Sequence, residues 1–201
     1  MIGIVSIGLS NISSLRNALD FLKVRNFLIE RPDQVTMAEK ILLPGVGSYN
    51  EAMNRLKRRG LDNVLKEEVS KGLPLMGICL GMQLLSDKGY EGGETEGLGL
   101  IPGTVMRMNN SLIKLPHMGW NSLKLRKSDS VISLNFNDID YYFIHSYEFI
   151  ANNSENILAT VDHGGHIAAI INKKNVYGCQ FHPEKSQRAG LELLKSFINN
   201  A

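Results

Sequence analysis

The chain has 201 residues, of which 43% are hydrophobic, and this is long enough for one domain with a full hydrophobic core. Its 22 basic and 20 acidic residues leave a net charge of +2, so charge gives no reason to expect binding to nucleic acid or to an anionic membrane. No apolar run approaches the roughly 20 residues that span a membrane, no signal peptide pattern is visible, and two cysteines make no disulfide framework. A cytoplasmic protein is therefore expected.

The first half of the chain alternates predicted strands and helices. Apolar strands are expected at Ile2–Ile7, Lys40–Leu43 and Pro74–Ile78. Helices are expected at Asn11–Leu22, from a capping Ser48 to about Arg59, at Leu61–Lys71, and directly after Cys79. Strands that alternate with helices indicate a parallel sheet with helices on both faces.

The second half is richer in strands. Candidates are Thr104–Met108, Leu112–Leu115, Asn121–Leu125, Tyr141–Ile144, Ile157–Val161, Ile167–Asn172 and Val176–Phe181. Asn172–Asn175 indicates a hairpin turn between the last two strands, and Ser186–Asn199 reads as a closing amphipathic helix. The predicted fold class is therefore α/β, an open and mainly parallel sheet flanked by helices, with an added antiparallel strand portion.

The segment Gly77-Ile78-Cys79-Leu80-Gly81 joins a predicted strand to a predicted helix. It has the G-x-nucleophile-x-G pattern of an elbow, with cysteine in the position that serine takes in hydrolases. Glycine on both sides keeps side chains out of the sharp turn, and the helix N-terminus favours a thiolate at Cys79. The alternative is a buried structural cysteine between ordinary turn residues. Cys179 has no such elbow around it and is expected to be a core residue.

A cysteine nucleophile needs a base, and the base needs a partner that fixes its tautomer. His182 follows the last predicted strand, and Pro183 stiffens the step to Glu184, so that carboxylate can fold back onto the imidazole ring. Alternatively, Glu184 merely favours the start of the closing helix. His163 and His166 flank a Gly-Gly turn, but the chain offers no convincing further ligands, so no metal site is expected.

Three segments together resemble class I glutamine amidotransferases. Gly77–Gln83 and Phe181–Ser186 are similar to the two signatures of that family, in the same order, and Pro44–Gly47 resembles its oxyanion loop. Two more segments, Pro116–Asn121 and Tyr142–Tyr147, look like the glutaminase subunits of imidazole glycerol phosphate synthases. The resemblance covers essentially the whole chain and implies a single glutamine amidotransferase domain at residues 1–201.

The resemblance implies an enzyme that hydrolyses glutamine without a cofactor or metal and passes ammonia to a (β/α)₈-barrel synthase (cyclase) subunit in a heterodimer, for histidine biosynthesis. Cys79 would be the nucleophile, His182 the base and Glu184 the residue that orients it. The residues implied to hold the glutamine, its thioester or the oxyanion are Gly45, Val46, Gly47, Leu80, Gln83, Ser146 and Tyr147. The residues implied to meet the synthase subunit are Met118, Trp120, Tyr142 and Lys185.

One segment departs from the family pattern. Family members usually carry Asp-Tyr-Gly and then Gly-Asn after the first strand, whereas this chain has Ser6-Ile7-Gly8-Leu9-Ser10-Asn11. The departure keeps open a paralogous glutaminase that feeds ammonia to a sugar-modifying amidotransferase in surface-glycan biosynthesis. An unrelated cysteine hydrolase or peptidase and a non-catalytic interaction module are the remaining alternatives.

Overall fold

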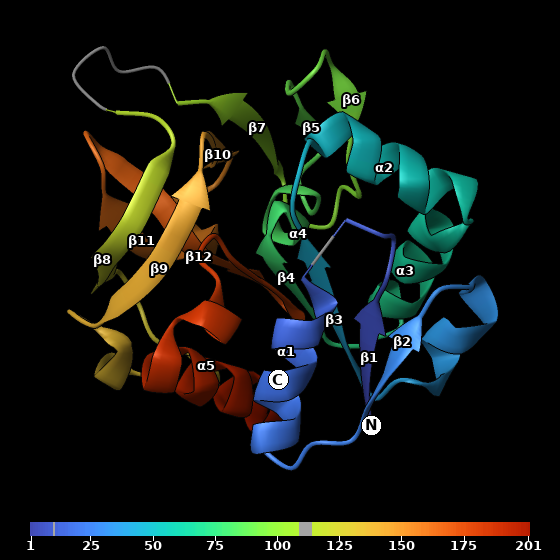
Figure 1. Ribbon diagram of the computed structural model, residues 1–201. Helices are drawn as coiled ribbons and strands as arrows, with labels where there is room; N and C mark the ends of the chain where they lie inside the picture. Colours follow the sequence, from blue (N-terminus) through green and yellow to red (C-terminus); the bar gives the residue numbers. More distant parts are fainter. Residues whose placement is uncertain (10, 109–113) are drawn as a thin grey trace.

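Two β-sheets organise the chain in the computed structural model, which describes residues 1–9, 11–108 and 114–201 (Figure 1). The larger sheet has nine strands in the order β2-β1-β3-β4-β13-β12-β11-β8-β9. In that order the strands are Asn26–Ile29, Ile2–Val5, Lys40–Gly45, Leu75–Cys79, Val176–Cys179, His166–Lys173, Ile157–Asp162, His117–Leu125 and Asp140–His145. The first five strands of this order pair in parallel, and each later strand is antiparallel to its neighbour.

Helices cover both faces of the parallel part of the sheet. Successive side chains of each strand point to opposite faces, so alternate residues pack against the helices on each face. One face packs against α1 (Ile12–Phe21) and α5 (Gln187–Asn200), which Figure 1 shows below the sheet. The opposite face packs against α2 (Tyr49–Arg58), α3 (Leu61–Ser70) and the single-turn α4 (Leu80–Gln83). This large central sheet flanked by helices confirms the predicted α/β fold class.

A second, four-stranded sheet has the order β10-β7-β5-β6, formed by Tyr147–Ala151, Gly103–Arg107, Lys88–Gly89 and Thr95–Glu96. The chain passes from the large sheet to this one at Ser146, between the last residue of β9 and the first residue of β10. Phe149 of β10 and Val105 of β7 are buried in the same core as α2 and α3. The second sheet therefore packs on the face of the large sheet that carries α4.

Most predicted elements are present, with boundaries shifted by a few residues. The turn after β12 is the predicted hairpin, because Lys173 pairs with Val176 across it. Short 3-10 segments at Pro32–Met37 (η1), Leu134–Phe136 (η2), Ser154–Asn156 (η3) and Pro183–Lys185 (η4) complete the fold. Strand β2 was missed: it lies at the sheet edge with three of its four residues partly exposed, and its apolar run, residues 27–29, is only three residues long.

The predicted helix cap at Ser48 and the predicted strand at Leu112–Leu115 are not both observed as expected. Ser48 precedes α2 as expected, but its side chain makes no capping bond among the described residues; the Tyr49 N–H donates to the Glu91 carboxylate instead, at 2.8 Å. The first two residues of the predicted strand Leu112–Leu115 lie outside the described residues, and its last two are not in a strand. Nowhere in the described ranges is there a helix with the length and apolarity to cross a membrane.

Gly81, at the start of α4, packs directly against the backbone of Leu43 in β3. A Cβ at position 81 would lie 1.7 Å from the Leu43 carbonyl oxygen, which is backbone and has no freedom to move aside. We therefore expect Gly81→Ala to lower the free energy of unfolding by about 1 to 3 kcal/mol in urea denaturation, although alanine favours helix. Gly165→Ala is the control, because a Cβ there meets no described atom within 4 Å. Equal losses in the two variants would contradict the expectation.

Candidate active site

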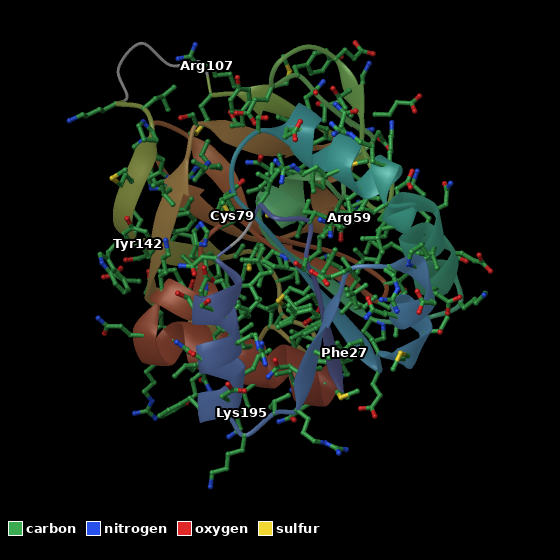
Figure 2. The ribbon with its side chains drawn as sticks, turned by 45° about the vertical axis from the view of Figure 1, so that its right-hand side comes forward. Phe27, Arg59, Cys79, Arg107, Tyr142 and Lys195 are labelled. Carbon is green, nitrogen blue, oxygen red and sulfur yellow. The ribbon has the colours of Figure 1, made fainter. Side chains whose placement is uncertain are left out.

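Cys79 ends β4 in the backbone conformation of a nucleophile elbow. Its φ of 56° and ψ of −113° are strained values for a residue with a side chain. A Cβ at Gly77 would lie 2.5 Å from the Gly81 carbonyl oxygen, so neither flanking glycine has room for a side chain. The Cys79 side chain is buried near the centre of the molecule (Figure 2). The turn predicted from the Gly-x-Cys-x-Gly pattern is therefore present.

His182 and Glu184 follow β13 and form a buried pair. The His182 Nδ1 lies 2.7 Å from Glu184 Oε1, and the two side chains are only 3% and 6% exposed. Ser186 fixes the backbone around them, because its hydroxyl donates to the His182 carbonyl at 2.7 Å and accepts from the Tyr142 N–H at 3.0 Å. Glu184 thus folds back onto the ring, as the His-Pro-Glu segment predicted.

The charge state of His182 depends on both of its neighbours. Burial lowers the pKa of this imidazole, but its interactions with Cys79 and with Glu184 raise it by more, and the net result is a pKa of about 10. The Glu184 carboxylate also fixes the proton on Nδ1, which leaves Nε2 for proton transfer. Nε2 makes no hydrogen bond of normal geometry to any of the described residues. An imidazolium at this position has the proton that a departing amine needs.

The predicted oxyanion loop lies against the elbow but does not present its N–H group. Gly45 pairs with Cys79 in the register of β3 and β4, which brings the loop to the nucleophile. The Val46 N–H, however, donates to the Leu9 carbonyl at 2.8 Å, so it is not directed at an oxyanion. Gly47 follows with a φ of 96°, a conformation that favours glycine.

The segment after β1 that departs from the family pattern is held by two arginines, Arg55 in α2 and Arg59 at the C-terminal end of α2. Arg55 donates to the carbonyls of Ile7 and Gly8 at 3.2 and 3.3 Å, and Arg59 donates to the Ser6 carbonyl at 2.6 Å. Arg55 is itself paired with Glu51 at 2.7 Å. These bonds position the backbone next to Leu9, which accepts the Val46 N–H, and so support the present orientation of the oxyanion loop.

A cavity of about 280 Å³ opens beside Cys79. The residues that line it are Val46, Gly47, Cys79, Leu80, Gln83, Glu91, Ile144, His145, Ser146, Tyr147, His182 and Lys185. These include every residue predicted to hold glutamine except Gly45, which is the last residue of β3; Glu184 does not line the cavity but contacts His182. A larger groove, of about 680 Å³, lies between η2 and α5 and contains none of the predicted site residues. The cavity thus brings the predicted residues together, and their chemical roles stay predictions.

Sequence reasoning missed Glu91, Gln180 and His145 as residues of this site. Glu91 lies in a glycine-rich turn between β5 and β6, and no local pattern connects it to Cys79. Gln180 directly precedes the Phe181–Ser186 signature, and its amide nitrogen lies 3.9 Å from the Cys79 sulfur. His145 was noted as part of a family segment but was not assigned to the cavity.

His145 continues into a buried chain of hydrogen bonds. Its Nδ1 donates to the Tyr147 carbonyl at 2.9 Å, so its Nε2 accepts from His117 Nδ1 at 2.9 Å, and His117 Nε2 accepts from the Asn121 amide at 2.9 Å. This pattern requires both rings to be neutral. Burial and neighbouring histidines lower the pKa of His117 to about 3, and burial, as the largest cause, lowers that of His145 to about 4.

The residues predicted to meet a synthase subunit form one exposed face on β8, β9 and η4. Trp120 pairs with Tyr142 across the two strands, with their rings edge to face at 5.9 Å, and the Lys185 ammonium lies 5.9 Å from the Tyr142 ring centre. Met118 and Trp120 are 59% and 45% exposed. Figure 2 shows Tyr142 on the strand side of the molecule, away from α2 and α3. The four residues are therefore contiguous and accessible.

Comparison with known protein families gives a match over most of the chain. The family described as "Glutamine amidotransferase class-I" matches residues 7–201. The chain belongs to the class I glutamine amidotransferase family. Among relatives of this amidotransferase, the imidazole glycerol phosphate synthase subunit HisH of Oceanobacillus iheyensis is 41% identical over 197 residues, which cover 98% of each chain. The HisH subunit of Listeria monocytogenes is 44% identical over 199 residues, covering 98% of this chain and 94% of that one.

Solved structures agree with this fold. A crystal structure of a glutamine amidotransferase superposes with a TM-score of 0.78 at 18% identity, covering 98% of this chain and 96% of that one. A chain in the structure of PurLQS from Thermotoga maritima also has a TM-score of 0.78, at 21% identity, covering 98% and 97%. At these identities the likeness supports the amidotransferase fold alone.

The two cysteines give a direct test of the nucleophile. Cys79→Ala is expected to reduce glutamine hydrolysis by more than about 10³-fold, because the attacking sulfur is lost. Cys179→Ala is the matched control: Cys179 is fully buried in β13, so its loss creates a small void that costs about 1 kcal/mol of stability and leaves most of the activity. Glutamate release is the measurement, and wild-type rates in Cys79→Ala would overturn the assignment.

The raised pKa of His182 predicts how stability changes with pH. The folded chain binds this proton with a pKa of about 10, against about 6.5 for an unfolded histidine, so the stabilisation is fully present below about pH 6.5 and is lost as the pH rises to about 10. Glu184→Gln removes one cause of the shift and should lower Tm more at pH 6 than at pH 10. Glu94→Gln removes an exposed carboxylate paired with Lys88 and should give a small difference at both. An equal Tm loss at both pH values for Glu184→Gln would contradict this account.

Proposed function

We propose that this chain is the glutaminase subunit of an imidazole glycerol phosphate synthase in histidine biosynthesis. It hydrolyses glutamine to glutamate and passes the ammonia to a (β/α)₈-barrel synthase subunit. The observation that carries the glutaminase chemistry is the convergence of the strained Cys79 elbow and the buried His182–Glu184 pair on one cavity. The HisH relatives, about 40% identical over nearly their whole lengths, support the choice of pathway.

The reaction proceeds through a thioester. His182 holds the proton of the Cys79 thiol at Nε2, in keeping with its raised pKa, and the sulfur attacks the carboxamide carbon of the glutamine side chain. The carbonyl oxygen becomes an oxyanion that backbone N–H groups of Leu80 and Val46 stabilise. The His182 imidazolium gives its proton to the departing nitrogen, which leaves as ammonia. Water then attacks the thioester and gives its proton to His182, the C–S bond breaks, glutamate is released, and the Cys79 sulfur and the His182 proton are back in their starting state.

Glu91 is suited to hold the charged end of the substrate. Glutamine carries an α-ammonium group, and Glu91 is the one carboxylate among the described residues that line the cavity. One of its oxygens, Oε2, accepts the N–H of Tyr49, and this bond fixes the side chain at the cavity wall. The second oxygen is then available for the ammonium, in the same cavity where Cys79 meets the carboxamide.

The Val46–Leu9 hydrogen bond supports control of this site by the partner subunit. To serve the oxyanion, the Val46 peptide has to rotate and give up the bond to Leu9, and the flanking Gly45 and Gly47 permit the rotation. A net hydrogen bond is worth about 1 kcal/mol, so a docking event needs to contribute only a few kcal/mol to change the populated orientation about 100-fold. Hydrolysis of glutamine would then await the partner that uses the ammonia.

The face formed by Met118, Trp120, Tyr142 and Lys185 is the surface on which we propose the synthase docks. It has the exposed aromatic and methionine side chains that are enriched in interfaces, and Lys185 both belongs to this face and lines the cavity. We also place the reaction in the cytoplasm, where thiols such as Cys79 stay reduced. The names of the relatives do not favour the sugar-modifying alternative.

A coupled assay tests this function. The isolated chain should release glutamate slowly, and addition of the histidine-pathway barrel subunit with its bound nucleotide substrate should raise the rate by about 100-fold or more. A barrel partner from a sugar-modifying pathway should give no activation. If the isolated chain already works at the rate of the complex, the gating is wrong, and if only the second partner activates it, the pathway is wrong.

Trp120→Ala tests the proposed docking face. It should weaken binding of the synthase by about 2 kcal/mol or more and separate glutamate release from synthesis of the product. Phe21→Ala is the control, since Phe21 is a 74% exposed aromatic on α1, outside the proposed face. Pull-down and steady-state glutamate release are the measurements. Wild-type binding and activation of Trp120→Ala would exclude this face as the interface.

A further inference from the structure

The amide of Gln180 has an orientation that its neighbours determine. Gln83 Nε2 donates to the Tyr147 carbonyl and to Gln180 Oε1, both at 3.0 Å. Because a carbonyl only accepts, Gln83 has to present its nitrogen here, and Gln180 therefore has to present its oxygen to Gln83. The Gln180 nitrogen is left facing Cys79 Sγ, at 3.9 Å. The chain of donors thus runs from Gln83 to Gln180 and ends at the nucleophile.

Gln180 lies where packing alone would favour an apolar residue. Its side chain is completely buried, and its neighbours in sequence, Cys179 and Phe181, are both core residues. Burying an amide is unfavourable unless its groups are hydrogen-bonded, so this side chain is present at a cost that an apolar residue would avoid. The two contacts of the amide, one to Gln83 and one to the Cys79 sulfur, offset that cost.

The Cys79 sulfur has two polar contacts that favour opposite protonation states. Its S–H donates to the Ile144 carbonyl at 3.9 Å, which favours the thiol. The Gln180 N–H donates to the sulfur, which favours the thiolate, because a hydrogen bond to a charged acceptor is the stronger one. When the thiol proton passes to His182, the first contact is lost and the second is strengthened. Long contacts of this kind tighten as charge develops.

We propose that Gln180 is a further catalytic residue of this site, whose amide N–H stabilises the Cys79 thiolate and is held in place by Gln83. The proposal rests on the proposed glutaminase function for its role in turnover. Gln180 transfers no proton: the thiol proton goes to His182, the sulfur forms the bond to the carboxamide carbon, and the amide contributes a hydrogen bond to the anion before attack and again when the thioester is cleaved.

Gln180→Met tests the proposal, because methionine has nearly the same shape and no N–H donor. The measurement is the pH profile of Cys79 alkylation by iodoacetamide, in a Cys179→Ala background so that a single thiol is followed. We expect the profile to move upward by about one to two pH units, the size of a charge-assisted hydrogen bond. In glutamine hydrolysis, kcat should fall by about 10- to 100-fold with little change in KM.

Two further variants make the outcome specific. Gln180→Glu keeps the shape and replaces the donor with a carboxylate, so it should move the alkylation profile at least as far as methionine. Gln34→Met is the matched control: the Gln34 side chain accepts two backbone hydrogen bonds at η1, which packs on β2 and α3, and its loss should leave the profile unchanged. Apart from the carboxyl group that Gln180→Glu introduces, the titratable groups around the sulfur are the same in all variants of the Cys179→Ala background, namely Glu91, His145, Tyr147, His182, Glu184 and Lys185.

Alkylation requires neither glutamine nor a partner, so its result is independent of the proposed function. Circular dichroism identifies the variants that fold, and Gln180→Glu retains polarity if the methionine variant does not fold. A folded Gln180 variant with the wild-type alkylation profile would overturn the proposal. A shifted profile in a protein without glutaminase activity would support the contact and refute the function instead.

Discussion

The absence of a side chain at Gly81, against the Leu43 carbonyl, is the constraint on which the site depends. It lets α4 begin directly over β3, and the chain can then reverse at Cys79 within one residue. The parallel register of β3 and β4 places Gly45 beside Cys79, so the predicted oxyanion loop begins next to the predicted nucleophile. A strained φ at Cys79 persists because strands on both sides of β4 hold it in register.

The remaining walls of the cavity come from the point where the chain changes sheets. Ser146 lies between β9 of the large sheet and β10 of the second sheet, and the carbonyl of the next residue, Tyr147, accepts from both Gln83 and His145. That single acceptor connects the elbow helix to the β8–β9 strands. The exposed side of these strands carries Met118 and Trp120, so the proposed docking face and part of the cavity wall share one pair of strands.

The predictable parts of this molecule are those that short stretches of sequence encode. The glycines around Cys79 and the His-Pro-Glu run each report a local backbone requirement, and the alternation of apolar segments reports the sheet, so the α/β fold and the candidate cavity follow from the sequence together with family resemblance. Glu91 and the Val46–Leu9 bond arise from contacts between distant segments, and no local pattern records them. Strand β2 escaped because its apolar run, residues 27–29, is shorter than the roughly four to eight residues by which a strand is recognised.

The neutral tautomers of His145 and His117 determine whether these two rings can protonate the ammonia that the site releases. Each ring nitrogen of both residues is already engaged, either as donor or as acceptor, in a chain that ends at the Asn121 amide. With lowered pKa values, of about 4 for His145 and about 3 for His117, these rings hold no exchangeable acid proton at neutral pH. In contrast to His182, the part of the cavity wall that His145 forms is therefore unable to protonate ammonia. The free base that leaves Cys79 would pass it without being trapped as ammonium, and would keep the lone pair that makes it a nucleophile in the next reaction.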